Sequence, residues 1–339
     1  MRNDSGHSSN LVFTRPVRVA VVGSGPFAEF HIQAFGENPD CELVAIVSRS
    51  IGRGQELARK YSVPHHYMST AELFAAQEID GVAVVTSGVF HLEPTLEALE
   101  SGASVLLEKP VVMSSAEGEI LQKAVAGSPA FVMPAHILRF ATPYQELRNR
   151  LQAGAIGHPR ALSFRRHRQS NHDEFFHDVH PALMTMIHDI DLAIWLTGSV
   201  PFGATAREIT VSSRSQPLVV WAEAETADGT ALSFQVSWSL ARGSIPDSLE
   251  AVGQEGAISL SLSPRVEDLS PAGSALDDCL TPVVGHGALR EEVRHFIDAI
   301  RFGRTPSVVT IEEALAGIRF AESVIEAAKR NHNESSRQK

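Results

Sequence analysis

The sequence predicts an α/β protein with an N-terminal, doubly wound parallel sheet and a C-terminal α+β domain built on a large, mostly antiparallel sheet. Three observations predict this fold. In the first half, apolar runs rich in β-branched residues alternate with helical patterns, and a glycine-rich turn follows the first run. In the second half, short segments alternate apolar and polar residues between turn signals. A chain of 339 residues is long for one domain, so two domains are expected.

The first half alternates predicted strands with predicted helices. The run VRVAVV, which begins at Val17, is typical of a strand buried on both faces, and a helical stretch follows it. The same alternation continues along the chain and predicts βαβ units with right-handed crossovers. The other predicted strands are 42–50, 81–87 and 104–110, and the predicted helices are 26–39, 52–61 and 91–102.

The second half predicts strands followed by helices. Two helical patterns come last, one closing at Gly303 and the other preceding a polar tail at 331–339. We expect a flexible tail at 1–14, a first domain at 15–135 and a second at 136–333. The predicted antiparallel strands are 206–215, 218–229, 230–240, 247–256 and 257–262.

The turn after the first strand has the pattern G-x-G-x-x-A. In a dinucleotide-binding turn the first glycine permits the bend, the second lets backbone approach a pyrophosphate, and the small third residue lets helix pack on strand. Amides at the helix N-terminus then hold the anion. An ordinary tight turn also accepts two glycines, but the position between a strand and a helix favours a Rossmann dinucleotide site. The six residues are Gly23, Ser24, Gly25, Pro26, Phe27 and Ala28.

The end of the second predicted strand selects the dinucleotide. An acidic residue there holds the ribose 2′-hydroxyl of NAD, whereas the 2′-phosphate of NADP needs cations and small donors. The chain has Ser48, Arg49 and Ser50 there, with Arg53 beyond, and no acidic residue from 44 to 54. We predict NADP(H) over NAD(H), because Arg49 can pair with a phosphate that a carboxylate would repel. The alternative is that Arg49 is a solvated surface charge.

Charge and composition argue against several other classes of protein. The 29 Lys and Arg residues face 40 Asp and Glu residues, and the formal charge of −11 repels a phosphate backbone, so no nucleic-acid partner is expected. Cys41 and Cys279 lie far apart and outside any zinc-ligand spacing, which favours a reduced, cytoplasmic setting. No apolar run reaches about 18 residues, so no membrane span is expected.

Several short motifs together resemble those of the Gfo/Idh/MocA oxidoreductase family. The resemblance extends over nearly the whole chain and implies a nicotinamide-dependent Rossmann domain. It also implies a C-terminal domain that binds a small carbohydrate-like substrate and forms a homodimer or homotetramer through its sheet. Besides the glycine-rich turn, the motifs are TSGVFH at 86–91, EKP at 108–110, HILRF at 136–140, GAIG at 154–157 and MIHDIDLAIWLTG at 186–198.

The resemblance implies a proton-transfer role for Lys109. In the family the EKP lysine lies beside the nicotinamide and exchanges a proton with the substrate, which hydride transfer requires. Partial burial there is expected to move its pKa toward the working range. Glu108 would help position the site, and His188 would hydrogen-bond the reacting oxygen. The alternatives are a surface Glu-Lys turn and a core histidine. The further cofactor contacts implied are Thr86, Ser87 and His91.

One position departs from the family pattern. Many of its dehydrogenases place an aspartate four residues before the histidine, and this chain has Met184 there. Either Lys109 and His188 suffice, or a nearby group such as Asp178 or His180 substitutes, or the dehydrogenase activity is lost. No metal site is expected, because hydride transfer needs none. The expected substrate contacts are Arg139, Arg166 and Asp191.

The sequence therefore predicts an NADP(H)-dependent oxidoreductase that acts on a secondary alcohol or ketone of a sugar, sugar derivative or cyclitol. Two alternatives of the same fold stay open. One is a non-catalytic regulator that binds dinucleotide and sugar, for which Met184 is the motivation. The other is a glycosidase that retains NAD, which the cationic end of the second strand disfavours.

Overall fold

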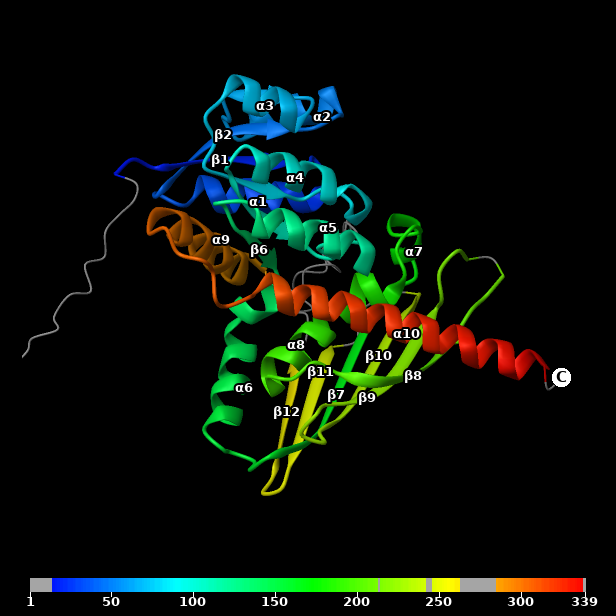
Figure 1. The fold of residues 1–339 in the computed structure, drawn as a ribbon. Helices are drawn as coiled ribbons and strands as arrows, with labels where there is room; N and C mark the ends of the chain where they lie inside the picture. The colour runs from blue at the N-terminus through cyan, green and yellow to red at the C-terminus, as the bar shows by residue number, and fades with distance from the viewer. Residues whose placement is uncertain (1–13, 213, 242–245, 263–284, 338–339) are drawn as a thin grey trace, which may run out of the picture.

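The computed structural model describes residues 14–212, 214–241, 246–262 and 285–337. The predicted tail at 1–14 therefore lies outside the described residues, apart from Thr14, and so does Cys279. Two six-stranded sheets organise the rest of the chain, with helices around and between them (Figure 1). This is the α/β architecture that the sequence predicts.

The first sheet is parallel throughout and has the strand order β3-β2-β1-β4-β5-β6. The order reverses between β1 and β4, so a crevice for a ligand is expected at their carboxyl ends. Strands β1, β4, β5 and β6 are almost entirely buried, as β-branched runs covered by helices on both faces should be. The strands are β1 Val17–Val22, β2 Cys41–Val47, β3 His65–Tyr67, β4 Gly81–Val84, β5 Ser104–Glu108 and β6 Val132–Ala135.

Local signals explain where the helices of this half begin. Pro26 occupies the first turn of α1, where its missing N–H costs nothing. Ser69 and Ser114 cap α3 and α5, and each hydroxyl accepts a hydrogen bond from a backbone N–H three residues on. The helices are α1 Pro26–Gly36, α2 Ile51–Lys60, α3 Thr70–Ala76, α4 Leu92–Glu100 and α5 Ser115–Ala126, with short 3₁₀ turns η1 Gly88–Phe90 and η2 Ile137–Phe140.

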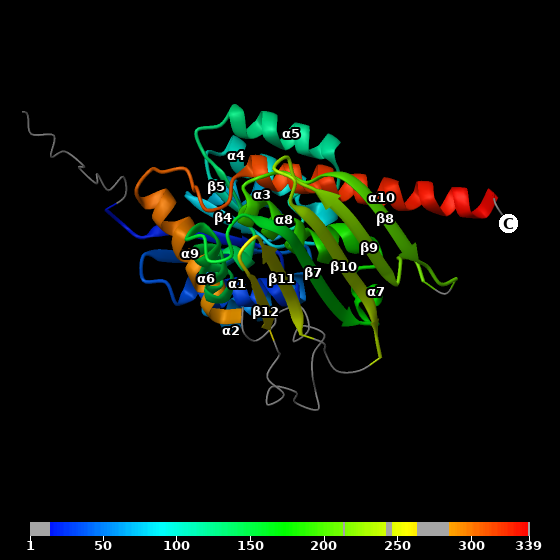
Figure 2. The same ribbon diagram turned by 90° about the horizontal axis from the view of Figure 1, so that it is seen from below.

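The second sheet has the order β12-β11-β7-β10-β9-β8, and only its central pair, β7 and β10, is parallel among the described strands. Figure 2 shows these strands side by side. The prediction of a mostly antiparallel sheet is confirmed. The strands are β7 Pro159–Gln169, β8 Phe202–Ile209, β9 Val219–Glu225, β10 Ala231–Leu240, β11 Asp247–Gly253 and β12 Ala257–Leu262.

Helices from the second half pack against both sheets. Helix α10 contacts β8 and α8 on one side and α5 and β6 on the other, and α9 packs on α1 and η2 (Figure 1). These contacts fix the two sheets relative to each other. The elements are α6 Thr142–Gln152, α7 His172–Phe175, the π-helical turn η3 Ala182–Met186, α8 Ile187–Thr197, α9 Gly285–Arg301 and α10 Ile311–Arg337.

Three details differ from the sequence-based expectation. Helix α10 continues to Arg337 through residues that were expected to form a polar tail. The short strands β3 and β6 and the helices α3, α5, α6 and α7 were not expected. The wider π-helical turn η3, which precedes α8, was also not expected. Within the described residues, the helices are too short or too polar to cross a bilayer.

Candidate active site

The glycine-rich turn lies at the crevice between β1 and β4. Gly23 has a φ of +133°, and a Cβ there would lie 2.5 Å from the carbonyl oxygen of Val85, so only glycine fits without a shift. Gly25 precedes α1, and a Cβ there would meet nothing within 4 Å. The N-terminus of α1 thus faces open space. A pyrophosphate fits this position, because the first-turn amides of α1 point toward it.

Serines line the next part of the crevice. The hydroxyl oxygens of Ser24 and Ser48 lie 2.6 Å apart, and the backbone N–H of Ser50 donates to the Ser48 hydroxyl at 3.1 Å. The exposed Arg49 guanidinium lies over the Phe90 ring, 4.3 Å from its centroid. This stacking brings the end of β2 next to the η1 turn that follows β4. Ribose hydroxyls or a ribose phosphate therefore have small donors and one guanidinium nearby.

Arg53 has a different environment from the one predicted. Its guanidinium pairs with Glu29 at 2.9 Å and with Glu56 at 3.0 Å, so its charge is already offset. Glu29, from the first turn of α1, also accepts hydrogen bonds from Lys60 and Tyr61. The search for an acid at the end of β2 missed Glu29, because it comes from another element. Cofactor contact by Arg53 stays a prediction, which these ion pairs disfavour.

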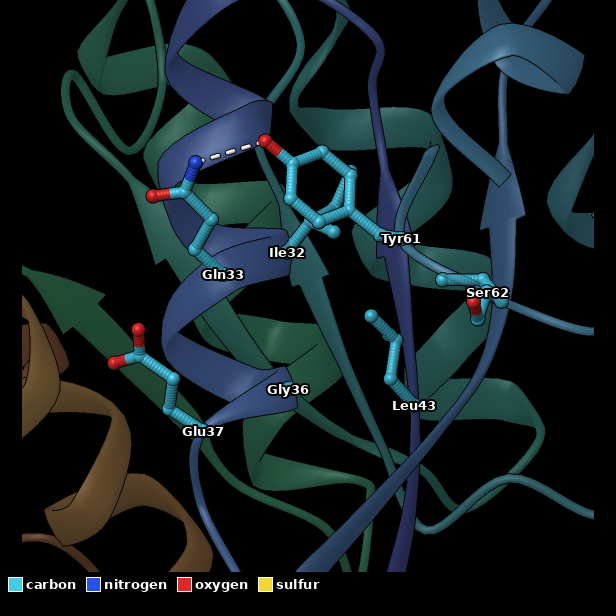
Figure 3. Close-up of a pocket in the computed structure, with 8 residues that line it drawn as sticks. Ile32, Gln33, Gly36, Glu37, Leu43, Tyr61 and Ser62 are labelled. Carbon is cyan, nitrogen blue, oxygen red and sulfur yellow. Dashed lines mark hydrogen bonds between the residues drawn. The ribbon is translucent and has the colours of Figure 1, made fainter. Parts of the chain in front are cut away.

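A hollow near the C-terminal end of α1 is lined by residues that extend the contacts of Glu29. Figure 3 shows Gln33 of α1 directed at Tyr61, and the Gln33 side-chain amide donates to the Tyr61 hydroxyl at 2.8 Å. The Tyr61 hydroxyl in turn donates to Glu29 at 2.7 Å. The polar groups here bind one another and hold the loop after α2 against α1. The lining residues are Ile32, Gln33, Gly36, Glu37, Leu43, Tyr61, Ser62 and Val63.

His91 connects the loops after β4 and β5. Its Nδ1 lies 2.7 Å from the carbonyl oxygen of Pro110, and its Nε2 lies 3.0 Å from that of Thr86. Burial lowers the pKa of His91, so the ring is neutral at pH 7 and its single N–H donates to one of these carbonyls. The ring therefore faces backbone. Ser87, beside Thr86, immediately precedes the η1 turn. His91 thus holds the loops after β4 and β5 together, and its contact with the cofactor stays a prediction.

Glu108 and Lys109 come directly at the end of β5. The Glu108 carboxylate accepts a hydrogen bond from the backbone N–H of Lys109 at 3.0 Å and lies 3.0 Å from Nε2 of His31. The Lys109 amine extends toward the second half of the chain and donates to the carbonyl oxygen of Met184 at 3.1 Å. A buried strand thus ends in two charged groups because each one has a partner.

His188 lies in the first turn of α8, one turn after Met184. Its side chain is partly exposed, but its Nδ1 is buried and has no hydrogen-bond partner within the described residues. Burial, and then the charges of Lys109 and Arg166, hold the pKa of His188 well below its ordinary value. The ring is neutral at pH 7 and lies close enough to Lys109 to interact electrostatically. A neutral imidazole can donate to a reacting oxygen without adding charge.

A second imidazole near Lys109 was not predicted as a site residue. Burial lowers the pKa of His172 to about 3, and the charges of Arg168 and Lys109 add to the effect. Its ring packs beside that of Trp238, with centroids 5.7 Å apart. Trp238 donates from its indole nitrogen to the Thr185 hydroxyl at 3.0 Å. The sequence carries no motif signal that singles out His172.

A buried ion network underlies α8. Arg166 donates to Asp189 at 2.6 Å and to Asp247, and Arg168 donates to the other oxygen of Asp247 at 2.7 Å. All four side chains are nearly inaccessible to solvent. Two positive and two negative charges are therefore matched inside the protein, which is the condition for burying them. The sequence analysis expected Arg166 as a substrate contact, whereas its acidic partners Asp189 and Asp247 were not predicted.

Arg139 belongs to a second buried ion network. Its guanidinium binds both carboxylate oxygens of Asp191, at 2.6 to 3.1 Å, and donates to Glu313 of α10 at 2.8 Å. Arg139 is 1% exposed and Asp191 3%. Substrate contact by Arg139, Asp191 and Arg166 stays a prediction, but their buried, paired charges favour structural roles.

Two residues were considered as substitutes for the absent aspartate, His180 and Asp178. His180 lies 2.9 Å from Glu208 through Nε2 and accepts from the backbone N–H of Ala182 through Nδ1. Asp178 is exposed. Substitution by either residue stays a prediction. In the described part of the chain, His, Cys, Asp and Glu form no group of three or more arranged for a metal ion.

Comparison with known families shows which family the chain belongs to. Residues 17–136 match the model of the oxidoreductase family with an NAD-binding Rossmann fold, and residues 144–259 match the GFO/IDH/MocA C-terminal domain. The chain belongs to the Gfo/Idh/MocA family. It is accordingly an NAD(P)-dependent oxidoreductase, as the motifs predicted. The domain that contains the crevice thus has the dinucleotide-binding fold that the glycine-rich turn indicates.

Individual relatives agree with this family. The chain is 28% identical over 319 residues to scyllo-inositol 2-dehydrogenase (NAD(+)) of Bacillus subtilis, covering 88% of this chain and 90% of the relative. It is 33% identical over 144 residues to D-glucoside 3-dehydrogenase of Escherichia coli, covering 42% and 41%. The fold is similar to that of myo-inositol 2-dehydrogenase from Lactobacillus plantarum, with a TM-score of 0.84, 20% identity and coverage of 94% and 98%.

A liganded relative has the same fold. Scyllo-inositol dehydrogenase from Lactobacillus casei, with bound NAD(H) and scyllo-inositol, matches with a TM-score of 0.83 and 19% identity. The match covers 94% of this chain and 98% of that one. At this identity the likeness concerns the fold alone.

Proposed function

We propose that the protein is an NADP(H)-preferring dehydrogenase or reductase for a secondary alcohol or ketone of a sugar, sugar derivative or cyclitol. The observation that carries the proposal is the position of the Lys109 amine. It extends from the end of β5, beside the dinucleotide crevice, to the turn that precedes His188. A proton donor and a neutral imidazole therefore border the same space. The relatives named for inositol or glucoside substrates support this class of substrate.

Lys109 and His188 have different roles at the substrate oxygen. When bound, the nicotinamide supplies the hydride in reduction and accepts it in oxidation. In ketone reduction, Lys109 gives a proton to the oxygen while the carbon receives the hydride, and in alcohol oxidation its neutral amine removes that proton. His188, neutral, donates a hydrogen bond to the same oxygen. The carbonyl of Met184 holds the amine in place without adding a negative charge beside it.

The preference for NADP(H) rests on Arg49. Arg53 is paired with Glu29 and Glu56, so Arg49 is the guanidinium at the end of β2 that can turn from the Phe90 ring to a phosphate. The Ser24 and Ser48 hydroxyls add small donors beside it. Some relatives are named for NAD, so the preference is a property that we propose for this chain in particular.

The outward face of the second sheet supports a homodimer or homotetramer. Strand register places Trp221 and Arg165 in one row across that face and Phe202 and Val252 in another. Trp221 is 51% exposed, Phe202 49% and Val252 47%. Exposed large apolar side chains on one sheet face are typical of a protein–protein interface. We propose that this face joins the subunits of a cytoplasmic enzyme, with 136–333 as the domain that binds substrate and assembles.

Stopped-flow measurements with NADPH, NADH and a panel of keto sugars and inososes test the proposal. We expect oxidation of NADPH by at least one cyclic ketone and tighter binding of NADPH than of NADH. Binding of NADPH without turnover across the panel would favour the non-catalytic regulator instead. Tighter binding of NADH would refute the cofactor preference alone.

A further inference from the structure

Met184 contacts the Lys109 amine through two chemically different atoms. Its backbone carbonyl oxygen accepts a hydrogen bond from Nζ at 3.1 Å, and its Sδ lies 3.9 Å from the same nitrogen. The carbonyl comes with any residue at position 184, whereas the thioether belongs to methionine. The backbone therefore holds the amine, and the side chain is left to shape the space beside it.

The thioether makes this part of the site apolar. The Met184 side chain is partly exposed, and a thioether is only a weak hydrogen-bond acceptor with no donor. With the reacting oxygen against Lys109, as in the proposed function, a substituent on the neighbouring carbon on the Sδ side would lie against the methionine. A hydroxyl there would lose its hydrogen bonds to water, and the thioether would not replace them.

The buried ion network nearby cannot compensate for that loss, and the buried His172 ring packs beside Trp238. Arg166, Arg168, Asp189 and Asp247 are buried and bonded to one another. His188 faces the reacting oxygen in the proposed function. A hydroxyl pressed against Met184 would therefore cost about 1 to 3 kcal/mol, the penalty of an unsatisfied polar group, which corresponds to roughly a 5- to 150-fold loss in kcat/KM.

We propose that the site selects deoxy substrates: cyclic ketones or alcohols in which the carbon next to the reacting carbon, on the side of Met184, carries no hydroxyl. A deoxycyclitol or a deoxy sugar has this chemistry. The inference rests on the proposed function, because it assumes that the substrate oxygen lies against Lys109. It goes further by making Met184 a specificity residue that acts through its side chain.

A pair of ketones tests the inference. One is a polyhydroxylated cyclohexanone with hydroxyls on both carbons next to the carbonyl, and the other lacks one of these two hydroxyls. Wild-type enzyme is expected to show a kcat/KM at least about fivefold higher for the deoxy ketone. Met184→Gln keeps the length of the side chain and adds an amide, so it is expected to abolish or reverse this preference. Met184→Leu, also apolar, is the matched control and should keep it.

The outcomes separate the inference from the function on which it rests. Equal kcat/KM for the two ketones with wild-type enzyme, or the same change of preference in the leucine and glutamine variants, would overturn the inference and leave the oxidoreductase intact. The wild-type ratio decides even where a variant fails to fold. Absence of turnover with both ketones and both dinucleotides would overturn the proposed function and the inference together.

Discussion

Replacing the two glycines of the dinucleotide turn separates folding from cofactor binding. Gly23→Ala places a methyl group 2.5 Å from the carbonyl oxygen of Val85, on a residue with a φ of +133°. Backbone strain of this kind costs about 1 to 3 kcal/mol, and overpacking costs about as much again. We expect a loss of about 2 to 6 kcal/mol in the free energy of unfolding. Urea denaturation followed by circular dichroism measures it.

Gly25→Ala is the matched change. Gly25 has a φ of −66° and a ψ of 171°, which alanine adopts without strain, and a Cβ there meets nothing within 4 Å. The free energy of unfolding should therefore change by no more than about 1 kcal/mol, the cost of a poorer helix cap. The methyl group would occupy the space proposed for the pyrophosphate, so the Kd for NADPH should rise about tenfold or more.

The two variants are expected to differ, with Gly23→Ala losing stability and Gly25→Ala losing affinity for NADPH. Fluorescence titration with NADPH measures the Kd of Gly25→Ala and of the wild-type protein, and urea denaturation compares the stability of both variants. A Gly23→Ala protein as stable as wild type would refute the account of the turn. Unchanged NADPH binding by Gly25→Ala would refute the placement of the pyrophosphate.

Two further predictions concern the charges around the site. Arg49→Ala should weaken NADPH binding by about 10- to 100-fold, the value of a charge-assisted hydrogen bond, and change NADH binding little; equal losses for both would contradict the proposed phosphate contact. Burial raises the pKa of Asp247, but Arg166 and Arg168 outweigh it and hold that pKa below its ordinary value. Its stabilisation is therefore present above about pH 4 and lost as pH falls through the lowered pKa. Asp247→Asn should lower the free energy of unfolding by about 3 to 5 kcal/mol at pH 7, and the variant should lose less stability than wild type as the pH falls. Urea denaturation at several pH values measures both. An equal loss of stability at acid pH in variant and wild type would contradict the lowered pKa of Asp247.

The fold could be predicted from the sequence because its signals are local. β-Branched runs such as the one from Val17 give buried strands, and the period of two in residues 230–240 gives a sheet with one covered face. Strand β3 was missed because it has only three residues, and β6 because Pro134 lies within its short run. The end of α10 was missed because polar composition alone does not end a helix.

The site could be predicted only in part, because pairing between distant residues leaves little trace in a sequence. Lys109 and His188 carry motif signals, and the structure brings both to one space. Arg139 and Arg166 looked like substrate contacts because their partners were unknown. Those partners include Asp191, in the same motif as His188. Such networks become visible only when the elements that carry them are packed together.

The behaviour of Lys109→Met in single-turnover hydride transfer tests the central claim most directly. NADPH oxidation by a cyclic ketone that the wild-type enzyme reduces would be followed in a stopped-flow instrument, with the Kd for NADPH measured in parallel. The account predicts hydride transfer slowed by about 100- to 10,000-fold with NADPH binding preserved, because the proton donor is removed and the glycine turn is intact. A variant that binds NADPH and transfers hydride at the wild-type rate would contradict it.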